Sequence, residues 1–135
     1  MSQAGTKTIS VLLADDHDIL RDGLATVMNE FSDIKVVGMA VSGWDAVDQC
    51  MALQPDVVLM DILMPDIDGL SAARIIRERH PNTRVVVLSS FEEEHLVEAA
   101  REVGVSGYLL KNVSIDDLAN AIRDAYLGKP GTFPR

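Results

Sequence analysis

The chain has 135 residues, which is enough for one domain of ordinary size and too few for a second. Its composition is 47% hydrophobic and 24% charged, which supplies an aliphatic core and excludes an intrinsically disordered chain. The net charge of −9 argues against direct nucleic-acid binding, and no apolar stretch approaches the length of a membrane span.

Short apolar runs rich in β-branched residues alternate along the chain with segments of helical spacing. In chain order these runs are ISVLLA from Ile9, IKVVGMAV from Ile34, DVVLM from Asp56, RVVVLS from Arg84 and GYLL from Gly107. In the segments that follow each run, apolar residues recur three or four positions apart, as at Leu20 and Leu24. Ser42 and Ser114 stand where helix N-caps are expected. The pattern predicts five successive strand–helix units.

This alternation predicts parallel crossovers and a sheet that is covered on both faces. Near-continuous apolar runs such as DVVLM and RVVVL favour buried parallel strands. We expect a single α/β domain with a doubly wound, five-stranded, flavodoxin-like sheet of strand order 2-1-3-4-5 and five helices on both faces. Residues 8–128 would form this domain, and residues 1–7 a disordered N-terminal tail. The Gly/Pro-containing residues 129–135 would begin an interdomain linker or form a C-terminal tail.

The single cysteine, Cys50, allows no internal disulfide and favours a reducing compartment. It lies in an apolar helical pattern, so we expect a packed core thiol rather than a reactive one. The first residues, MSQAGTKT, lack the apolar run of a secretory signal. We therefore expect a cytoplasmic protein with no membrane partner.

Polar or ionisable residues close four of the five runs. They are Asp15 and Asp16 after the first, Asp61 after the third, Ser89 and Ser90 at the end of the fourth, and Lys111 after the fifth. Ligands of such sheets bind at the carboxyl ends of the strands. Each residue has a structural alternative, since Asp and Ser cap helices and turns, and the lysine could be a solvated surface charge. Together they favour a Mg²⁺ site at which a lysine and a hydroxyl could bind phosphoryl oxygens.

The segments LLADDHDILRDGL, DVVLMDILMPDIDGL, VVVLSSF and GYLLK resemble the receiver domains of two-component response regulators, the CheY-like superfamily. Their order and spacing match this family from about Thr8 to Leu127. The D-D-H start, the VSGYLLK stretch and Asn112, where many receivers have proline, resemble receivers of the NarL/FixJ type. That subfamily carries a LuxR-type helix-turn-helix output domain.

The resemblance implies a role for each acidic residue of the site. Asp61 would be the phosphoacceptor. Mg²⁺ would be bound by Asp16 and Asp61, by Asp15, often through water, and by the backbone carbonyl of Leu63. The domain would then be a switch that catalyses its own phosphorylation and dephosphorylation, rather than an enzyme acting on other substrates.

The remaining roles implied by the resemblance concern the switch. Lys111 would pair with a phosphoryl oxygen, and Ser89 would be the hydroxyl that moves toward the phosphoryl group. Ser90 would line the mouth of the pocket, and Tyr108 would be the aromatic residue whose ring goes inward as the hydroxyl moves. His17 could be interpreted as a metal ligand, but a helix-start residue beside the site is the favoured interpretation.

The partners follow from the same resemblance. A sensor histidine kinase would donate the phosphoryl group, and the response would appear on the surface formed by the helix around residues 96–103, the strand 107–110 and the last helix. A homodimer could form through that surface. DNA would be bound by an output domain absent from this chain, with transcription as the regulated process; the alternative is a stand-alone receiver.

Three rival functions remain open at this point. A phosphatase of the haloacid dehalogenase type would need an Asp-x-Asp at the end of the first strand, whereas the acids here are adjacent. A pseudo-receiver that never accepts phosphate usually lacks one of the acids or the lysine. A flavin-binding protein would need a Ser/Thr/Gly-rich phosphate loop after the first strand, which this sequence lacks.

Overall fold

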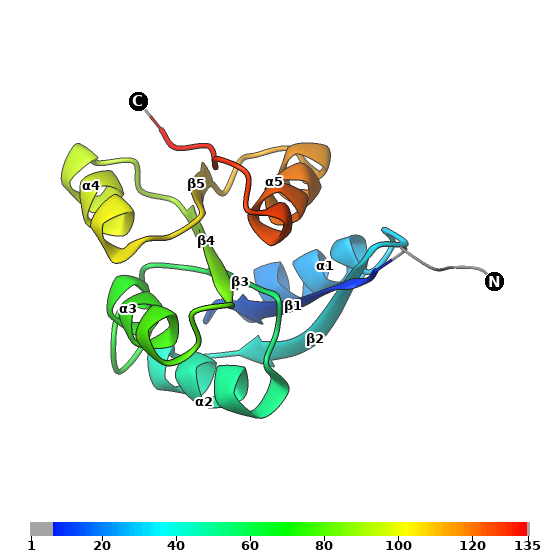
Figure 1. The fold of residues 1–135 in the computed structure, drawn as a ribbon, viewed down its shortest axis with the longest axis horizontal. Coiled ribbons are helices and arrows are strands. Elements are labelled where there is room, and N and C mark those ends of the chain that lie inside the picture. The colour runs from blue at the N-terminus through cyan, green and yellow to red at the C-terminus, as the bar shows by residue number, and fades with distance from the viewer. Residues whose placement is uncertain (1–6, 135) are drawn as a thin grey trace.

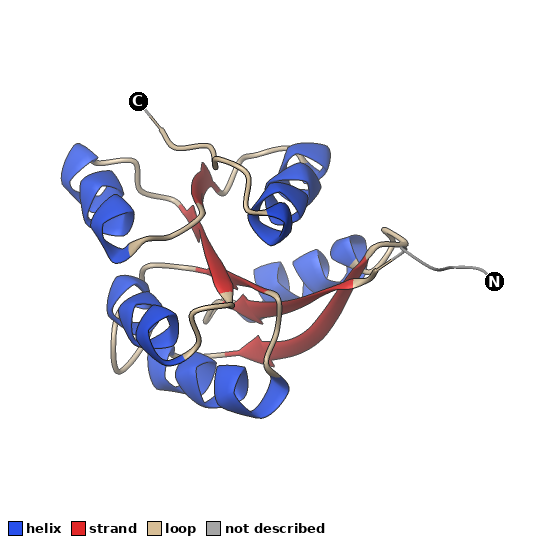
Figure 2. Ribbon diagram, viewed as in Figure 1, coloured by secondary structure: helices blue, strands red, loops and turns tan. Residues whose placement is uncertain are grey.

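The computed structural model describes residues 7–134, in which five strands alternate with five helices (Figures 1 and 2). The strands are β1 (Ile9–Ala14), β2 (Ile34–Ala40), β3 (Val57–Met60), β4 (Arg84–Ser89) and β5 (Gly107–Leu110). The helices are α1 (Asp18–Met28), α2 (Gly43–Leu53), α3 (Gly69–Arg79), α4 (Glu94–Val103) and α5 (Ile115–Leu127). All neighbouring strands are parallel, in the order β2-β1-β3-β4-β5, so the predicted doubly wound fold is confirmed. The tail predicted at residues 1–7 lies outside the described residues, apart from Lys7.

Alternate residues of each strand face two different layers of helices. Helices α2, α3 and α4 cover one face of the sheet, and α1 and α5 cover the other (Figure 1). Met60 packs in the first layer with Ile76 of α3, whereas its neighbour Leu59 packs in the second with Ile122 of α5. The strands are therefore buried on both faces, which explains their near-continuous apolar sequences.

Side-chain caps begin three of the helices. Ser42 and Ser114 each accept a hydrogen bond at 3.1 Å from the backbone N–H three residues further on, so both predicted N-caps are confirmed. Asp68 does the same for α3, at 2.9 Å from the N–H of Ser71. Such caps satisfy N–H groups that have no partner within the helix and typically stabilise it by about 1 kcal/mol each.

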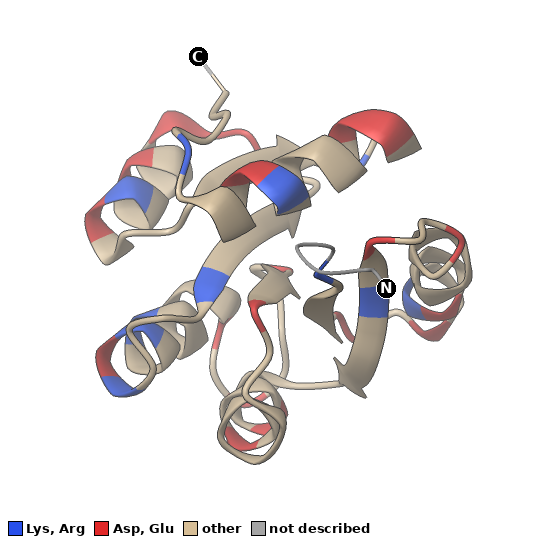
Figure 3. Cartoon of the chain, turned by 45° about the vertical axis from the view of Figure 1, so that its right-hand side comes forward, with Lys and Arg blue, Asp and Glu red and all other residues tan. Residues whose placement is uncertain are grey.

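Charged residues lie mainly on the helices and loops, whereas the strands contain few of them (Figure 3). Cys50 is fully buried, and burial raises the pKa of its thiol to about 12, as expected for a packed core thiol. Within residues 7–134, none of the helices combines the length and the apolar composition that crossing a membrane requires.

The chain continues beyond α5 as an extended segment without helix or strand structure. This segment runs across the outer edge of β5, between α4 and α5 (Figure 1), where the carbonyl of Thr132 accepts a hydrogen bond at 2.8 Å from the N–H of Tyr108. The role of residues 129–135 as a linker or tail stays a prediction.

Candidate functional site

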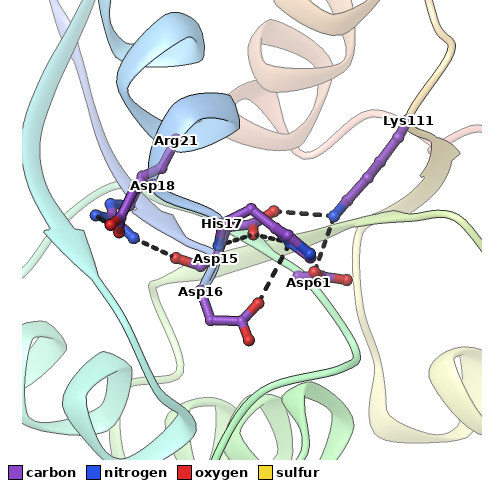
Figure 4. Close-up of polar contacts among 7 residues, drawn as sticks. All are labelled: Asp15, Asp16, His17, Asp18, Arg21, Asp61 and Lys111. Carbon is purple, nitrogen blue, oxygen red and sulfur yellow. Dashed lines mark hydrogen bonds and ion pairs between the residues drawn. The ribbon is translucent and has the colours of Figure 1, made fainter.

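The acids at the ends of β1 and β3 lie side by side. These strands are neighbours in register, with Ala14 opposite Met60, and the N–H of Asp61 donates to the carbonyl of Ala14 at 3.0 Å. The next residues on each chain, Asp15 and Asp61, are therefore placed at the same edge of the sheet (Figure 4). One ligand atom from each of Asp15, Asp16, His17 and Asp61 lies within 4.8 Å of the others.

Lys111 points from the end of β5 into this acidic cluster (Figure 4). Its Nζ lies 2.9 Å from Oδ2 of Asp61 and 3.0 Å from Oδ2 of Asp15, and its side chain is only 16% exposed. Its backbone N–H donates to the carbonyl of Ser89 at 2.9 Å, which fixes the start of the side chain at the edge of the sheet. The alternative of a solvated surface charge is thus wrong for this lysine.

The two buried carboxylates experience different environments. Burial works to raise the pKa of Asp15, but hydrogen bonds from the His17 N–H and from Lys111 outweigh it, so the pKa lies below its usual value. For Asp61, burial dominates over the hydrogen bond from Lys111 and raises the pKa. Burial also disfavours the charged form of Lys111, yet its bonds to the two carboxylates raise the pKa of the amine. Of these two carboxylates, Asp61 is therefore the less stable in its charged form.

His17 occupies the N-cap position of α1 and adjoins both acids of the first strand end. Its Nδ1 lies 2.9 Å from Oδ1 of Asp15 and 3.3 Å from Oδ1 of Asp16, and its backbone N–H donates to Asp15 at 2.8 Å. Its side chain is 65% exposed, so the ring covers the outer side of the cluster. The position agrees with a helix-start residue beside the site, and a ring nitrogen of His17 is also within the group of atoms that could hold a metal.

Arg21 is a buried residue of the site that the sequence interpretation missed. Its Nη1 donates to the backbone carbonyl of Asp15 at 2.8 Å, and its Nη2 to Oδ1 of Asp18 at 2.7 Å. These bonds tie the first turn of α1 to the strand end that carries the acids. The signal was present in the spacing, because Arg21, Leu24 and Met28 fall on one face of the helix.

The hydroxyl predicted as the switch is fully buried at the end of β4. Oγ of Ser89 accepts a hydrogen bond at 3.0 Å from the N–H of Phe91, and the carbonyl of Phe91 accepts one from the hydroxyl of Tyr108. The Tyr108 side chain is 1% exposed, so its ring points inward in this structure, and burial raises the pKa of its phenol. Ser90 is exposed and, with Lys111, lines an open hollow of about 520 Å³.

The loop after β3 packs tightly against the phosphoacceptor candidate. A Cβ at Gly69 would lie 1.8 Å from the carbonyl oxygen of Asp61, and the N–H of Gly69 donates to the carbonyl of Ile62 at 2.7 Å. Only glycine permits α3 to begin this close to the strand end. Leu63, in the same loop, is exposed; the role of its carbonyl stays a prediction. The Lys111–Asn112 peptide bond, which the sequence left open, is trans.

The donor set fits a hard divalent cation. It consists of three carboxylates and one imidazole nitrogen, of which Asp15 and Asp61 are buried and Asp16 is partly exposed to solvent. Carboxylate oxygens with open positions for water are the surroundings in which Mg²⁺ is found. The acidic cluster could therefore hold such an ion, and Lys111 already compensates part of its negative charge.

A comparison with protein families assigns the chain to a known class. The family model described as response regulator receiver domain matches residues 11–123, and the chain belongs to this family. Receiver domains of response regulators are signalling switches of two-component systems and partner with histidine kinases.

Individual proteins indicate the kind of response regulator to which this chain is similar. The response regulator protein VraR of Staphylococcus saprophyticus is 43% identical over 118 residues, which are 87% of this chain and 56% of that protein. The receiver domain of the putative response regulator NarL from Mycobacterium tuberculosis superimposes with a TM-score of 0.87 at 32% identity, covering 91% of this chain and 99% of that one. For a DNA-binding response regulator of the LuxR family from Staphylococcus aureus the TM-score is 0.83 at 29% identity, with 87% and 98% covered. The chain spans a little over half the length of the VraR relatives.

Proposed function

We propose that this receiver domain is a phosphorylation-controlled switch in which Asp61 accepts a phosphoryl group from a sensor histidine kinase. The observation that supports this proposal most strongly is the position of Asp61. Its carboxylate is buried at the carboxyl end of β3, 2.9 Å from the amine of Lys111 and beside the acids of β1. A nucleophile, a cation and a set of metal-binding oxygens thus meet at one point.

In the transfer, one carboxylate oxygen of Asp61 attacks the phosphorus of a phosphohistidine. The new O–P bond forms as the P–N bond breaks, and the imidazole leaves with the electron pair and takes up a proton. The raised pKa of Asp61 reflects a carboxylate that gains little from its surroundings, which favours its reaction as a nucleophile. Lys111 would then pair with an oxygen of the phosphoryl group, at the place where it now contacts Asp61.

Mg²⁺ is the cofactor in this proposal. Asp15, Asp16, Asp61 and the carbonyl of Leu63 would hold it, with water in the remaining positions. When bound, the ion would offset the repulsion among the carboxylates and neutralise charge on the phosphoryl oxygens. Arg21 acts on this site indirectly, because it fixes the backbone between Asp15 and α1.

The output would be a change of shape on the surface formed by α4, β5 and α5. Ser89, Ser90 and Tyr108 are the residues proposed to carry it, and the hydrogen bonds among Ser89, Phe91 and Tyr108 provide a physical connection from the site to β5. A homodimer through this surface is part of the proposal. Transcriptional control through a LuxR-type DNA-binding domain is proposed from the relatives described as LuxR-family regulators, and a cytoplasmic location stays a prediction of the sequence.

The test is the intact mass of the protein after incubation with acetyl phosphate, with and without Mg²⁺. We expect one added phosphoryl group that requires Mg²⁺ and is lost in Asp61→Asn. Asp22→Asn, which removes an exposed acid on α1, is the matched control and should be modified like the wild type. Failure of the wild type to gain a phosphoryl group, with metal binding established separately, would favour a pseudo-receiver.

A further inference from the structure

The loop from Asp61 to Asp68 carries the phosphoacceptor candidate and the carbonyl of Leu63 that is proposed to bind Mg²⁺. The beginning of this loop is fixed by the core, because the side chain of Ile62 is only 5% exposed. The side chain of Leu63 is 57% exposed, so it does little to hold its own carbonyl in place. The position of that carbonyl therefore depends on how the rest of the loop is held.

Asp66, which follows Leu63 in the same loop, has a backbone conformation that is rare for a residue other than glycine. Its φ is 65°, in the left-handed region, which aspartate tolerates better than most residues. Among the residues that the structure describes, Gln54 is the only other non-glycine residue with a positive φ. Such conformations persist where the surrounding contacts determine them. The conformation of Asp66 therefore points to contacts that hold it.

Those contacts are made with the beginning of α2. Oδ1 of Asp66 accepts a hydrogen bond from the backbone N–H of Trp44 at 3.1 Å, and a second one from the N–H of Ile67. The N–H of Gly43 donates to the carbonyl of Pro65 at 3.3 Å. The first N–H groups of a helix have no partner within it, and the helix dipole favours a carboxylate there. The loop thus supplies acceptors for the N-terminus of α2.

Close packing adds to these hydrogen bonds. A Cβ at Gly43 would lie 2.3 Å from the carbonyl oxygen of Ile67, a distance that side chains do not reach. Desolvation works to raise the pKa of Asp66, but the hydrogen bonds from the N–H groups of Ile67 and Trp44 outweigh it, so the pKa lies below its usual value. Asp66 is therefore ionised at neutral pH and accepts both bonds as a carboxylate. The middle of the loop is joined to α2 by packing and by charge-assisted hydrogen bonds.

We propose that Asp66 is a positioning residue for the metal site, which holds the loop against α2 and thereby sets the Leu63 carbonyl for Mg²⁺. The inference rests on the proposed function, because it assigns a role toward the ion proposed there. Leu63 lies between the two places at which the loop is fixed, Ile62 in the core and Pro65 on α2. Mg²⁺ demands near-ideal octahedral geometry, so a ligand on a loosened loop contributes less to binding. Removing a group that orients a metal ligand lowers metal affinity by about 10–100-fold.

The experiment measures the Mg²⁺ dissociation constant of the whole chain by isothermal titration calorimetry. Asp66→Gly removes the carboxylate and leaves the φ of 65° accessible without strain. It should raise the dissociation constant about tenfold. Asp66→Asn keeps an oxygen at Oδ1, the atom that accepts both hydrogen bonds, so its dissociation constant should stay within about twofold of the wild-type value.

A second comparison separates position from charge, because the loss of any nearby acid weakens the attraction of a cation. Asp48→Asn removes an exposed acid from α2 and should change the dissociation constant as little as Asp66→Asn does, in about 0.15 M salt. Equal weakening by Asp66→Gly and Asp66→Asn would show that the carboxylate acts through its charge and would overturn the positioning role. A dissociation constant of Asp66→Gly equal to that of the wild type would also overturn it.

Gly43→Ala tests the same contact from the side of the helix and leaves the charge unchanged. Its methyl group would push Ile67 away from α2, so the dissociation constant should again rise by about tenfold. Gly23→Ala, in which nothing lies within 4 Å of the new methyl group, is the matched control and should bind Mg²⁺ like the wild type. Urea unfolding establishes that each variant is folded before the titration. A folded Gly43→Ala variant with wild-type affinity would refute the proposal.

The wild-type titration distinguishes this inference from the proposed function. If the wild type binds no Mg²⁺, the proposed metal site fails and the role of Asp66 fails with it. If the wild type binds Mg²⁺ and Asp66→Gly binds it equally well, the metal site stands and only the positioning role is lost.

Discussion

Neutralising the two buried carboxylates of the site should change stability in opposite directions. Burial raises the pKa of Asp61, so its charged form opposes folding at any pH above the unfolded-state pKa. The pKa of Asp15 is lowered despite burial, so its charged form supports folding over the same pH range. At pH 7 without metal, we therefore expect Asp61→Asn to be more stable than the wild type and Asp15→Asn to be less stable.

The magnitudes follow from the geometry. At an effective dielectric constant of about 20, Lys111 at 2.9 Å attracts the Asp61 carboxylate by about 6 kcal/mol. A second carboxylate within 4.8 Å opposes this by about 3.5 kcal/mol or more, and desolvation by several kcal/mol. The net gain expected for Asp61→Asn is about 1 kcal/mol. Asp15 accepts from donors on both of its oxygens, and an amide offers one acceptor, so Asp15→Asn should cost about 1.5–3 kcal/mol.

The assay is urea unfolding in the presence of EDTA, followed by far-UV circular dichroism. Added Mg²⁺ should stabilise the wild type more than Asp61→Asn, because one of the proposed ligand charges is missing from the variant. A less stable Asp61→Asn in EDTA, or an Asp15→Asn variant as stable as the wild type, would refute this description of the site's electrostatics.

Three further predictions concern other parts of the molecule. Gly69→Ala should destabilise the protein by about 1–3 kcal/mol and slow phosphorylation, because its Cβ would meet the carbonyl of Asp61. Gly23→Ala, a helical control with free space around the new methyl group, should stabilise by about 0.5–1 kcal/mol in the same urea titration. Asp33 has its pKa lowered by the hydrogen bond from Arg123, so the stability it contributes is present above its usual pKa of 3.8 and is lost as the pH falls. Both side chains of that pair are about one third exposed, so Asp33→Asn should cost about 0.5 kcal/mol at pH 7 and less at pH 2; an equal cost at both would contradict the linkage. Cys50, with its buried thiol and a pKa of about 12, should react with iodoacetamide only at the rate of unfolding, and rapid labelling of the native protein would contradict its placement in the core.

Much of the fold and of the site was predictable from the sequence. It follows from the spacing of apolar residues along the chain and from the common direction of parallel strands. Apolar runs of four to eight residues, each followed by a helical pattern, predict a parallel sheet with both faces covered. Parallel strands bring their carboxyl ends to one edge, so Asp61 and Lys111, 50 positions apart in sequence, are expected near each other. The strand order was expected from the doubly wound pattern, and the individual roles came from the family resemblance.

The features that the sequence interpretation missed depend on individual contacts that the pattern of residue types does not specify. Arg21 belongs to a residue type that is mostly exposed, and its burial depends on the free carbonyl of Asp15. Asp68 is an exposed acid of the loop before α3, and its side chain also caps that helix. The Gly/Pro composition of residues 129–134 predicts a linker and gives no sign that Thr132 and Phe133 dock on β5 and α4.

The most direct test of the central claim is to locate the phosphorylated residue. The protein would be treated with acetyl phosphate and Mg²⁺, reduced with borohydride, which converts an aspartyl phosphate to homoserine, and sequenced by tandem mass spectrometry. Our account predicts homoserine at position 61 and aspartate at positions 15 and 16. Homoserine at another position, or an intact Asp61 in protein that has gained a phosphoryl group, would contradict it.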